Sequence, residues 1–329
     1  MESSGTLESC QKSSIGVVHL TICNQYCRRP PNHLYLLFPK RKKIPPLIIM
    51  VNDYNFSLEF FPPDTSEKRD ELIKQAKILS GYKPRFVSVT YGADGSTQDR
   101  THKVIDVLKN ELNLHIIPHL TCVGSSKEKI QSIANSYWQK GFTSIVALRG
   151  DKQDDPVISD DQSNYYHFAV DLTIALKQLH NFTIFTAGYP EIHPEAPNKK
   201  FDLDNLKKKV DAGAQEVLTQ FFYNNDYFLR YRDDCQKIGI DIPITPGILP
   251  ISNLETILSF ATKCGIEVPQ AYFEQFNSLD DERKNTTDLG IELALRQIED
   301  LRSEGVNKFH LYTLNRRNMT EELIRHAFV

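Results

Sequence analysis

Charged and polar side chains interrupt several short apolar segments, and these are the residues whose types and spacing could support chemistry. Glu59 lies within the apolar segment FSLEFFPP. A carboxyl group buried there would have a raised pKa, which suits general acid catalysis near neutral pH. The alternative is a structural carboxylate that is tied to a neighbouring cation.

A second set of charges lies in ALRGD, where Arg149 and Asp151 flank Gly150. Residues two apart in an extended segment project on the same side. The arginine can bind a phosphate or a carbonyl oxygen, and the carboxylate can stabilise a developing positive charge. The alternative is an ion pair between these two residues.

Other polar residues follow apolar segments and could bind an anionic or planar ligand. The loop after Thr90 and Tyr91 contains two glycines, whose backbone N–H groups can approach an anion. GYPEIHPEA places an aromatic ring, a carboxylate and a histidine between prolines, which suits the stacking of a flat ring. Gln220 in TQFFY could bind an amide-bearing ring, Lys209 could reach a phosphate, and YTLNRRN supplies arginines. Each also has a structural interpretation as a turn, core or surface residue, as does His119 in PHLTC.

The chemistry that the sequence lacks narrows the function. No two of the 15 glycines have GxG spacing, so neither a GxGxxG dinucleotide fingerprint nor a Walker A loop occurs. There is no HExxH, no GxSxG and no cluster of histidines with paired carboxylates, and we expect no metal site. These absences favour a bound organic cofactor with acid–base assistance over a metal hydrolase.

Composition excludes several classes of protein. The chain has 329 residues, 40% hydrophobic and 25% charged, which is typical of a globular protein. Its 39 Lys and Arg against 42 Asp and Glu give a net charge of −3, which offers no electrostatic case for nucleic acid. No apolar run reaches the length of a membrane span. The six cysteines are scattered without a CxxC pair, so we expect a reducing compartment, the cytoplasm.

The elements that must position these residues alternate regularly from residue 55 onward. Short β-rich segments predict strands over 56–60, 86–91, 115–121, 144–149, 183–188, 216–222, 244–249 and 308–314. Amphipathic patterns predict helices over 66–80, 99–111, 127–140, 163–179, 202–212, 225–238, 252–264, 287–304 and 319–327. Eight strands in this length favour a (β/α)₈ TIM barrel over an open doubly wound sheet.

Capping residues support these helix boundaries. Ser66 and Ser126 are predicted N-caps. Glycines follow six of the helical segments as predicted C-caps, namely Gly81, Gly141, Gly213, Gly239, Gly265 and Gly305.

Residues 1–54 differ from the rest and are predicted to be a basic extension outside the catalytic domain of 55–329. Residues 1–50 hold seven Lys or Arg but only two acids, and 39–46 read PKRKKIPP. This composition fits four interpretations: a targeting segment, a nucleic-acid arm, a disordered extension, or an upstream start with Met50 as the true initiator.

Taken in order, the motifs resemble the methylenetetrahydrofolate reductases, a flavoprotein family. The resemblance rests on FSLEFFPP, SVTYGA with DRTH, PHLTC, IVALRGD, YPEIHPEA, LKKKVDAGA, TQFFY, PGILP and FHLYTLNR, and it runs from about residue 55 to 328. It implies a (β/α)₈ barrel that binds FAD without a GxGxxG motif. The chain is similar to the short bacterial-type enzymes, without the C-terminal regulatory domain of animal ones.

The resemblance also implies the reaction and its residues. NADH or NADPH reduces FAD and leaves, and 5,10-methylenetetrahydrofolate then takes its place and is reduced to 5-methyltetrahydrofolate, which feeds methionine synthesis. Glu59 matches the general acid, which also contacts the folate, and Asp151 matches the carboxylate that stabilises the cationic folate. Folate contacts are matched by Gln220, Phe260 and Arg316, and less closely by Thr256. Cofactor-binding positions are matched by Thr90, on the nicotinamide side, and by Tyr91, Ala93, His119, Arg149, Gly150, Asp151, Phe168, Ala169, Tyr189, His193, Asp202, Asn205 and Lys209.

Two other readings stay open from the residues alone. One is a barrel enzyme of another class, such as an aldolase or a folate-dependent methyltransferase. Flavin absorbance of the purified protein would distinguish a flavoprotein reductase from such an enzyme. The other is an inactive binding module, against which the intact Glu59 and Asp151 argue. The choice between NADH and NADPH is not readable, and the family implies a homodimer or homotetramer.

Overall fold

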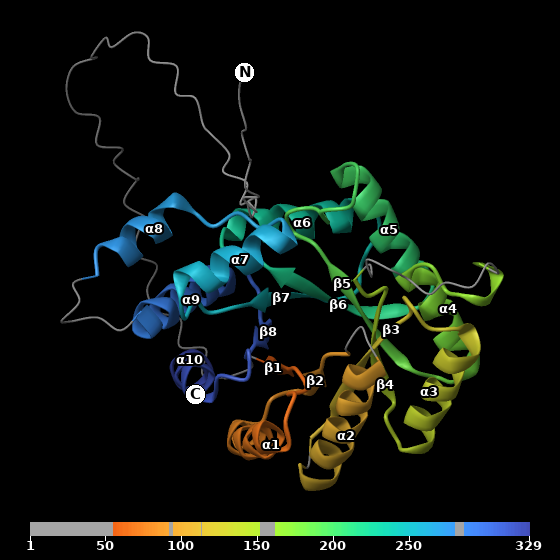
Figure 1. Cartoon of the computed structure of the whole chain (residues 1–329). Coiled ribbons are helices and arrows are strands. Elements are labelled where there is room, and N and C mark those ends of the chain that lie inside the picture. Colours follow the sequence, from red (N-terminus) through yellow and green to blue (C-terminus); the bar gives the residue numbers. More distant parts are fainter. Residues whose placement is uncertain (1–54, 92–94, 113, 152–161, 280–285) are drawn as a thin grey trace, which may run out of the picture. The chain divides into compact units, whose positions relative to one another are not determined.

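A closed barrel of eight parallel strands forms the centre of the molecule in the computed structural model, which describes residues 55–91, 95–112, 114–151, 162–279 and 286–329. The strands follow one another around the barrel in chain order (Figure 1). They are β1 Asn55–Phe60, β2 Val87–Val89, β3 Ile116–Thr121, β4 Ser144–Leu148, β5 Thr183–Gly188, β6 Ala214–Phe221, β7 Ile244–Ile248 and β8 Lys308–Tyr312. The predicted (β/α)₈ barrel is thus confirmed.

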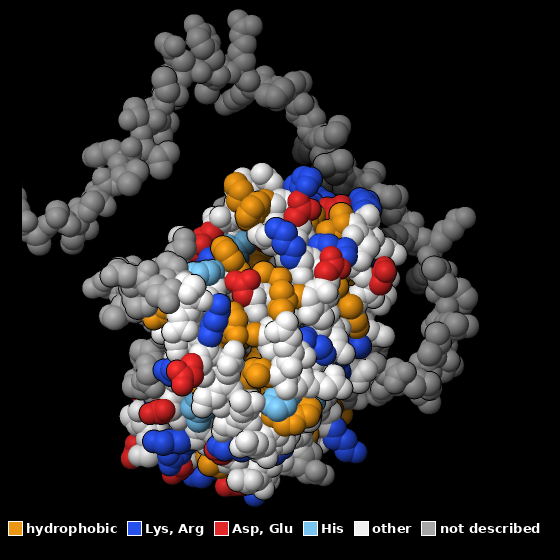
Figure 2. Space-filling model, turned by 90° about the vertical axis from the view of Figure 1, so that its right-hand side faces the viewer, with side chains coloured by type: hydrophobic (Ala, Val, Ile, Leu, Met, Phe, Trp, Pro, Cys, Tyr) orange, Lys and Arg blue, Asp and Glu red, His pale blue; other side chains and the backbone are white. Residues whose placement is uncertain are grey.

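Helices surround the strands on all sides that Figure 1 shows. They are α1 Ser66–Ser80, α2 Gly95–Glu111, α3 Lys127–Gln139, α4 Ala169–Leu179, α5 Lys199–Asp211, α6 Asn225–Lys237, α7 Leu254–Cys264, α8 Gln270–Asn277, α9 Thr286–Ser303 and α10 Arg317–Ala327. Within the described residues, none of these helices is long and apolar enough to span a membrane. Figure 2 shows the face on the right of Figure 1, where hydrophobic side chains lie in small groups among charged ones.

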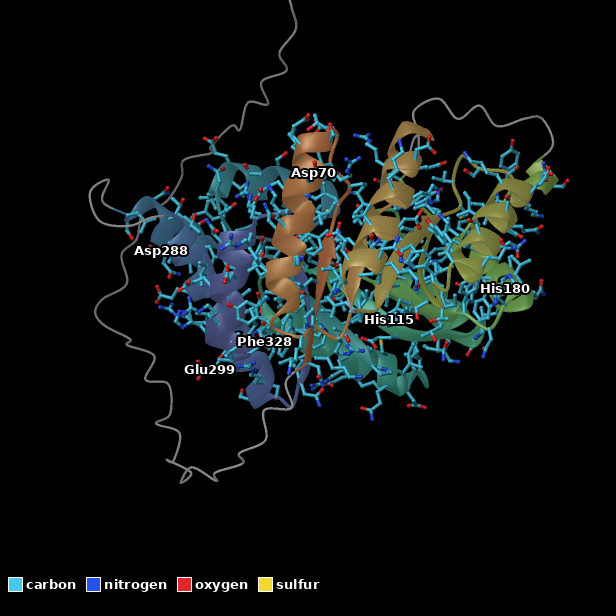
Figure 3. All side chains as sticks on the ribbon, turned by 90° about the horizontal axis from the view of Figure 1, so that it is seen from below. Asp70, His115, His180, Asp288, Glu299 and Phe328 are labelled. Carbon is cyan, nitrogen blue, oxygen red and sulfur yellow. The ribbon has the colours of Figure 1, made fainter. Side chains whose placement is uncertain are left out.

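Two apolar layers hold the barrel together. One fills the barrel interior with Phe86, Ile117, Val146, Phe185 and Leu218, and the rings of Phe86 and Phe185 meet edge to face at 5.1 Å. The other lies between the strands and the surrounding helices. Burying each such side chain contributes roughly 1.5–3 kcal/mol. At the C-terminus Phe328, labelled in Figure 3, packs its ring 4.9 Å from Phe56 and 5.7 Å from Phe309.

A buried ion pair crosses the barrel interior from β6 to the segment before β2. Arg85 donates two hydrogen bonds to the Glu216 carboxylate, at 3.0 and 2.7 Å, and the Thr245 hydroxyl donates a third at 2.7 Å. Burial raises the pKa of Glu216, but Arg85 and Thr245 outweigh it and hold that pKa below its ordinary value. The carboxylate is therefore ionised and satisfied in the folded protein.

Some predicted boundaries are wrong for local reasons. Thr65, rather than Ser66, caps α1, because its side chain accepts the backbone N–H of Lys68. The helix predicted over 163–179 begins only at Ala169. The Asp171 carboxylate accepts the backbone N–H of Phe168, which makes Phe168 the N-cap residue. The short helix α8 was not predicted. Ser126 caps α3 as expected. The predicted extension over 1–54 and the cofactor residue Ala93 lie outside the described residues.

Candidate active site

Most of the predicted cofactor residues line a single cavity at the carboxyl ends of the strands. The cavity holds about 550 Å³, which is the size of a small-molecule site. Its wall comes from the ends of β4 and β5, the start of α4 and the inner side of α5. Ten predicted residues line it, namely Arg149, Gly150, Asp151, Phe168, Ala169, Tyr189, His193, Asp202, Asn205 and Lys209.

Cationic groups line this cavity beside the carboxylates of Asp151, Glu195 and Asp202. The Lys209 ammonium donates a hydrogen bond to the Ala187 carbonyl at 2.6 Å, and burial lowers its pKa to about 8, although Asp202 opposes that shift. The N-terminus of α4 also lines the cavity through Phe168, Ala169 and Val170, and a helix N-terminus favours an anion. These groups suit a phosphate or diphosphate.

Aromatic rings form the other part of the wall. The Tyr189 and His193 rings meet edge to face, with centroids 4.5 Å apart. Phe168 and Phe201 line the same cavity and are 59% and 46% exposed, which leaves their faces free to stack on a flat ring. Phe201 was not predicted. The sequence does carry a signal for it. Phe201 is an aromatic residue that lies off the face of α5 where Leu203 and Leu206 are buried, so its ring is available to a ligand.

Glu59 lies in a separate polar cluster built by β1, β3 and β8. Its Oε2 is 3.3 Å from His310 Nε2, with which it is hydrogen-bonded, and His310 Nδ1 is 2.7 Å from the Ser57 hydroxyl. The distance to His119 Nε2 is also 3.3 Å, but the angle there is not that of a hydrogen bond. The structure thus brings Glu59 of β1 and His119 of β3 together, although β2 lies between these strands in the barrel.

The electrostatics of this cluster correct one expectation. Burial raises the pKa of Glu59, as expected, but His119 and His310 outweigh it and hold that pKa below its ordinary value. Burial lowers the pKa of His119 to about 4, so its imidazole is neutral near pH 7. The raised pKa that the sequence predicts for Glu59 is therefore wrong. His310 and Ser57 were not predicted, since they enter only through the pairing of β1 with β8.

Tyr312 of β8 pairs with Glu59 of β1. Its hydroxyl donates a hydrogen bond to the Thr219 carbonyl at 2.8 Å. Burial raises the pKa of its phenol, and electrostatic interactions with Glu59, Tyr189 and Cys264 raise it further. Tyr312 is therefore within electrostatic reach of both parts of the site.

The remaining predicted residues lie outside the cavity lining. Tyr91 is buried among the helix-packing residues, and its ring meets His102 edge to face at 5.8 Å. The backbone N–H of Thr90 bonds the Phe60 carbonyl at 2.9 Å, at the end of β1. Gln220 is half-buried at the end of β6, and Phe260 is 40% exposed on α7.

Arg316 completes this outer set. It lies at the start of α10, and its guanidinium contacts the Ser252 hydroxyl just before α7. Thr256, in the first turn of α7, donates its backbone N–H to Asn253 at 2.9 Å.

Metal-ligating chemistry finds no support in the part of the chain that the structure describes. No group of three or more His, Cys, Asp or Glu side chains there could hold a metal ion. The three described cysteines, Cys122, Cys235 and Cys264, are free thiols. The arrangement therefore consists of an anion- and ring-binding cavity beside a carboxylate–histidine cluster.

Comparison with known proteins accounts for this arrangement. The family model described as methylenetetrahydrofolate reductase matches residues 47–327. The 5,10-methylenetetrahydrofolate reductase of Pectobacterium carotovorum subsp. carotovorum is 43% identical over 266 residues, which cover 81% of this chain and 87% of that protein. The enzyme of the same name from Escherichia coli (strain K12) is also 43% identical, with 81% and 88% covered.

More distant proteins fit the same pattern. Methylenetetrahydrofolate reductase (NADH) 1 of Arabidopsis thaliana is 35% identical, and the alignment covers 79% of this chain but 46% of that longer protein. A Clostridium thermocellum protein whose solved structure is described as binding two copies of 5-methyl-5,6,7,8-tetrahydrofolic acid superimposes with a TM-score of 0.58. It is 16% identical and covers 84% of this chain and 94% of its own, so it supports the fold alone.

Proposed function

The chain belongs to the methylenetetrahydrofolate reductase family, and we propose that FAD is the flavin with which it reduces 5,10-methylenetetrahydrofolate, after accepting hydride from NADH or NADPH. The observation that carries this proposal is the cavity of about 550 Å³, in which ten residues from separate strand and helix ends converge. Bound FAD would supply the hydride acceptor and donor that these side chains lack.

The residues of the cavity fit FAD in three respects. Lys209 and the N-terminus of α4 suit the diphosphate, and the exposed rings of Phe168 and Phe201 suit a flat heterocycle. The Thr186 hydroxyl lines the cavity, yet it is buried with no hydrogen-bond partner among the described residues. A buried hydroxyl of that kind is expected to meet a polar ligand atom.

Glu59 is proposed as the general acid that protonates the folate. In the folded protein His119 and His310 outweigh the effect of burial and hold the pKa of Glu59 below its ordinary value. A substrate that excludes water from the mouth increases the desolvation that already raises the Glu59 pKa, so the carboxyl gains a proton as the folate binds. The proton then passes from a Glu59 oxygen to a folate nitrogen.

Asp151 is proposed to favour the cationic form of the folate. It lines the cavity. Burial is the main cause of the raised pKa of Tyr189 and of Cys264, and Asp151 contributes to both shifts. A carboxylate fixed beside the reacting carbon stabilises positive charge that develops there. We propose folate contacts for Gln220, Phe260 and Arg316 on the same side of the mouth.

The cellular setting is proposed to be the cytoplasm, with a homo-oligomer as the working form. Free thiols at Cys122, Cys235 and Cys264 support a reducing compartment. Burial raises the pKa of Cys122 to about 12, so this thiol is unreactive. Light scattering coupled to size-exclusion chromatography would give the number of subunits. We propose no nucleic acid or membrane partner.

The test of the cofactor starts with purified full-length protein. We expect a yellow protein with flavin absorbance that releases FAD, rather than FMN, on denaturation. Anaerobic titration with NADH and with NADPH should bleach the flavin, and methylenetetrahydrofolate should restore it. Protein that never binds flavin, or a reduced flavin that folate fails to reoxidise, would overturn the proposal.

A further inference from the structure

The turn between β5 and α5 holds a strained backbone at the wall of the cavity. It carries Tyr189 and His193, whose rings line the cavity. Between them Ile192 has φ 75°, in the left-handed region. A β-branched residue is a genuine outlier there, and such a conformation persists only where its surroundings enforce it.

Part of that enforcement comes from the far end of α7. Glu191 Oε2 accepts a hydrogen bond from the backbone N–H of Glu267 at 2.8 Å. The turn also touches the C-cap of α7, because a Cβ at Gly265 would lie 3.1 Å from Pro194 Cγ. Gly265 itself has φ 67° and takes the left-handed cap conformation.

The Glu191 carboxyl group is otherwise poorly satisfied. Its Oε1 is buried and has no hydrogen-bond partner among the residues that the structure describes. Burial raises the pKa of Glu191, the bond from the Glu267 backbone opposes this, and the Glu267 carboxylate raises it further. A buried carboxyl oxygen without a partner is costly, so its placement calls for a function.

The segment that Glu191 holds directly follows α7. α7 carries Phe260, and Cys264 follows one turn later on the same face. The charge of Asp151 contributes to the raised pKa of the Cys264 thiol, so the end of α7 lies within electrostatic reach of the cavity. The turn and the end of α7 therefore adjoin one another beside the cavity.

We propose that Glu191 is a positioning residue that couples the Tyr189–His193 turn to α7, and so holds these two elements of the active site in register. The inference rests on the proposed function, in which the turn contacts the flavin and Phe260 on α7 contacts the folate. Glu191 acts through the Glu267 backbone and not through its own charge.

The kinetic test compares three variants. Glu191→Ala removes the oxygen that accepts the Glu267 backbone N–H, and Glu191→Asp shortens the side chain by one methylene so that its carboxylate no longer reaches that N–H. Glu191→Gln keeps an acceptor oxygen at the same distance without the charge. Per bound flavin, we expect the first two to raise the KM for methylenetetrahydrofolate roughly three- to tenfold, the value of one hydrogen bond, with a smaller change in kcat. Glu191→Gln should restore KM to near the wild-type value.

Glu267→Gln is the matched control, because Glu267 contributes its backbone N–H and should leave KM unchanged. A purely structural role would lower thermal stability and flavin content but leave KM per bound flavin at the wild-type value. That result, or a Glu191→Gln variant as impaired as Glu191→Ala, would overturn the inference.

A second measurement is independent of activity. Hydrogen exchange of the peptide that contains the Glu267 amide, and of the 189–195 peptide, should speed up together in Glu191→Ala and Glu191→Asp. Unchanged exchange in both peptides would overturn the coupling. If the wild-type protein carried no flavin, the proposed function would fail, whereas this exchange comparison would still decide the role of Glu191.

Discussion

The Arg149 guanidinium and the Glu195 carboxylate form a two-fold hydrogen-bonded pair at the rim of the cavity, with N–O distances of 2.8 and 2.9 Å. The hydrogen bonds that Arg149 donates to Glu195 are the main reason that the pKa of Arg149 is raised. Arg149 Nε also donates to the Gly150 carbonyl at 3.3 Å. The guanidinium is thus oriented before a ligand arrives, but a carboxylate competes with any anion for its donors.

This competition predicts opposite effects for the two partners. Arg149→Gln should weaken flavin binding by roughly tenfold or more, because a charge-assisted hydrogen bond contributes about 1.5–3 kcal/mol. Glu195→Gln should leave binding unchanged or strengthen it, because it removes a negative charge next to the diphosphate. Fluorescence titration of apoprotein with FAD measures both, and a loss of affinity in Glu195→Gln equal to that in Arg149→Gln would contradict the competition.

Lys209 predicts how flavin affinity depends on pH. Burial lowers the pKa of Lys209 to about 8 in the ligand-free protein, and a bound diphosphate would raise it again. Binding therefore takes up a proton above that pH. The affinity for FAD should be highest below pH 8 and should fall as the pH rises above that value. It should level off once the pH exceeds the raised pKa that Lys209 has in the complex.

Dissociation constants measured across this range would check the sign. Lys209→Met should bind FAD more weakly near neutral pH and should lose this part of the pH dependence. Its residual slope is the control for other titrating groups. If the pH dependence of FAD affinity were the same in Lys209→Met as in the wild type, a group other than Lys209 would be responsible for it.

The Arg85–Glu216 pair predicts a loss of stability without a loss of function. Arg85→Met would leave the buried Glu216 carboxylate without its cation, and breaking a buried pair costs about 3–5 kcal/mol. Because the pKa of Glu216 is lowered in the folded protein, its contribution is present above the unfolded-state pKa and is lost as the pH falls through the folded-state value.

Thermal melts over a series of acidic pH values would test this. The wild-type protein should lose its advantage over Arg85→Met as the pH falls. Since neither Arg85 nor Glu216 lines the cavity, flavin affinity of the folded variant should match the wild type. An equal melting temperature for both proteins near neutral pH would show that the pair contributes no net stability.

The sequence predicts the barrel well because periodicity is a local signal. The eight strands appear where short β-rich segments alternate with amphipathic ones, and Ser126 caps its helix as its position suggests. The helix α8 was missed because its eight residues are only about two turns, too short for a periodic pattern to be distinguished. The start of α4 was misplaced because Asp171 caps the helix from inside it.

Part of the cavity could also be predicted, since Arg149, Asp151, Tyr189 and His193 follow strand ends that a barrel must gather at one edge. The predicted cavity residues at the start of α4 and on α5, apart from Lys209, were expected only from the family resemblance.

The protonation state of Glu59 could not be predicted. It depends on His119 and on His310, which lies 251 residues away in the chain, and both distances follow from the register of strands that pair only in the folded barrel. Burial alone predicts the wrong direction for the Glu59 pKa.

Glu59→Gln is the sharpest test of the mechanism. Proton donation is needed in the folate half-reaction, whereas hydride transfer from the nicotinamide to the flavin requires no acid. The variant should fold, bind FAD and be reduced by NADH or NADPH at the wild-type rate, because Glu59 is not among the residues that line the cavity. Reoxidation by methylenetetrahydrofolate should slow by roughly 10²–10⁴-fold, the usual contribution of general acid catalysis.

Stopped-flow measurement of the two half-reactions separates the outcomes for Glu59. Glu59→Asp serves as the control, since it keeps a carboxyl group near His310 and should retain more of the folate rate than Glu59→Gln. If Glu59→Gln lost flavin or unfolded, the carboxylate of the β1–β3–β8 cluster would be structural, tied to His310 at 3.3 Å as a buried polar pair. If both half-reactions ran at normal rates, the proton would reach the folate from another donor, and the role assigned to Glu59 would be wrong.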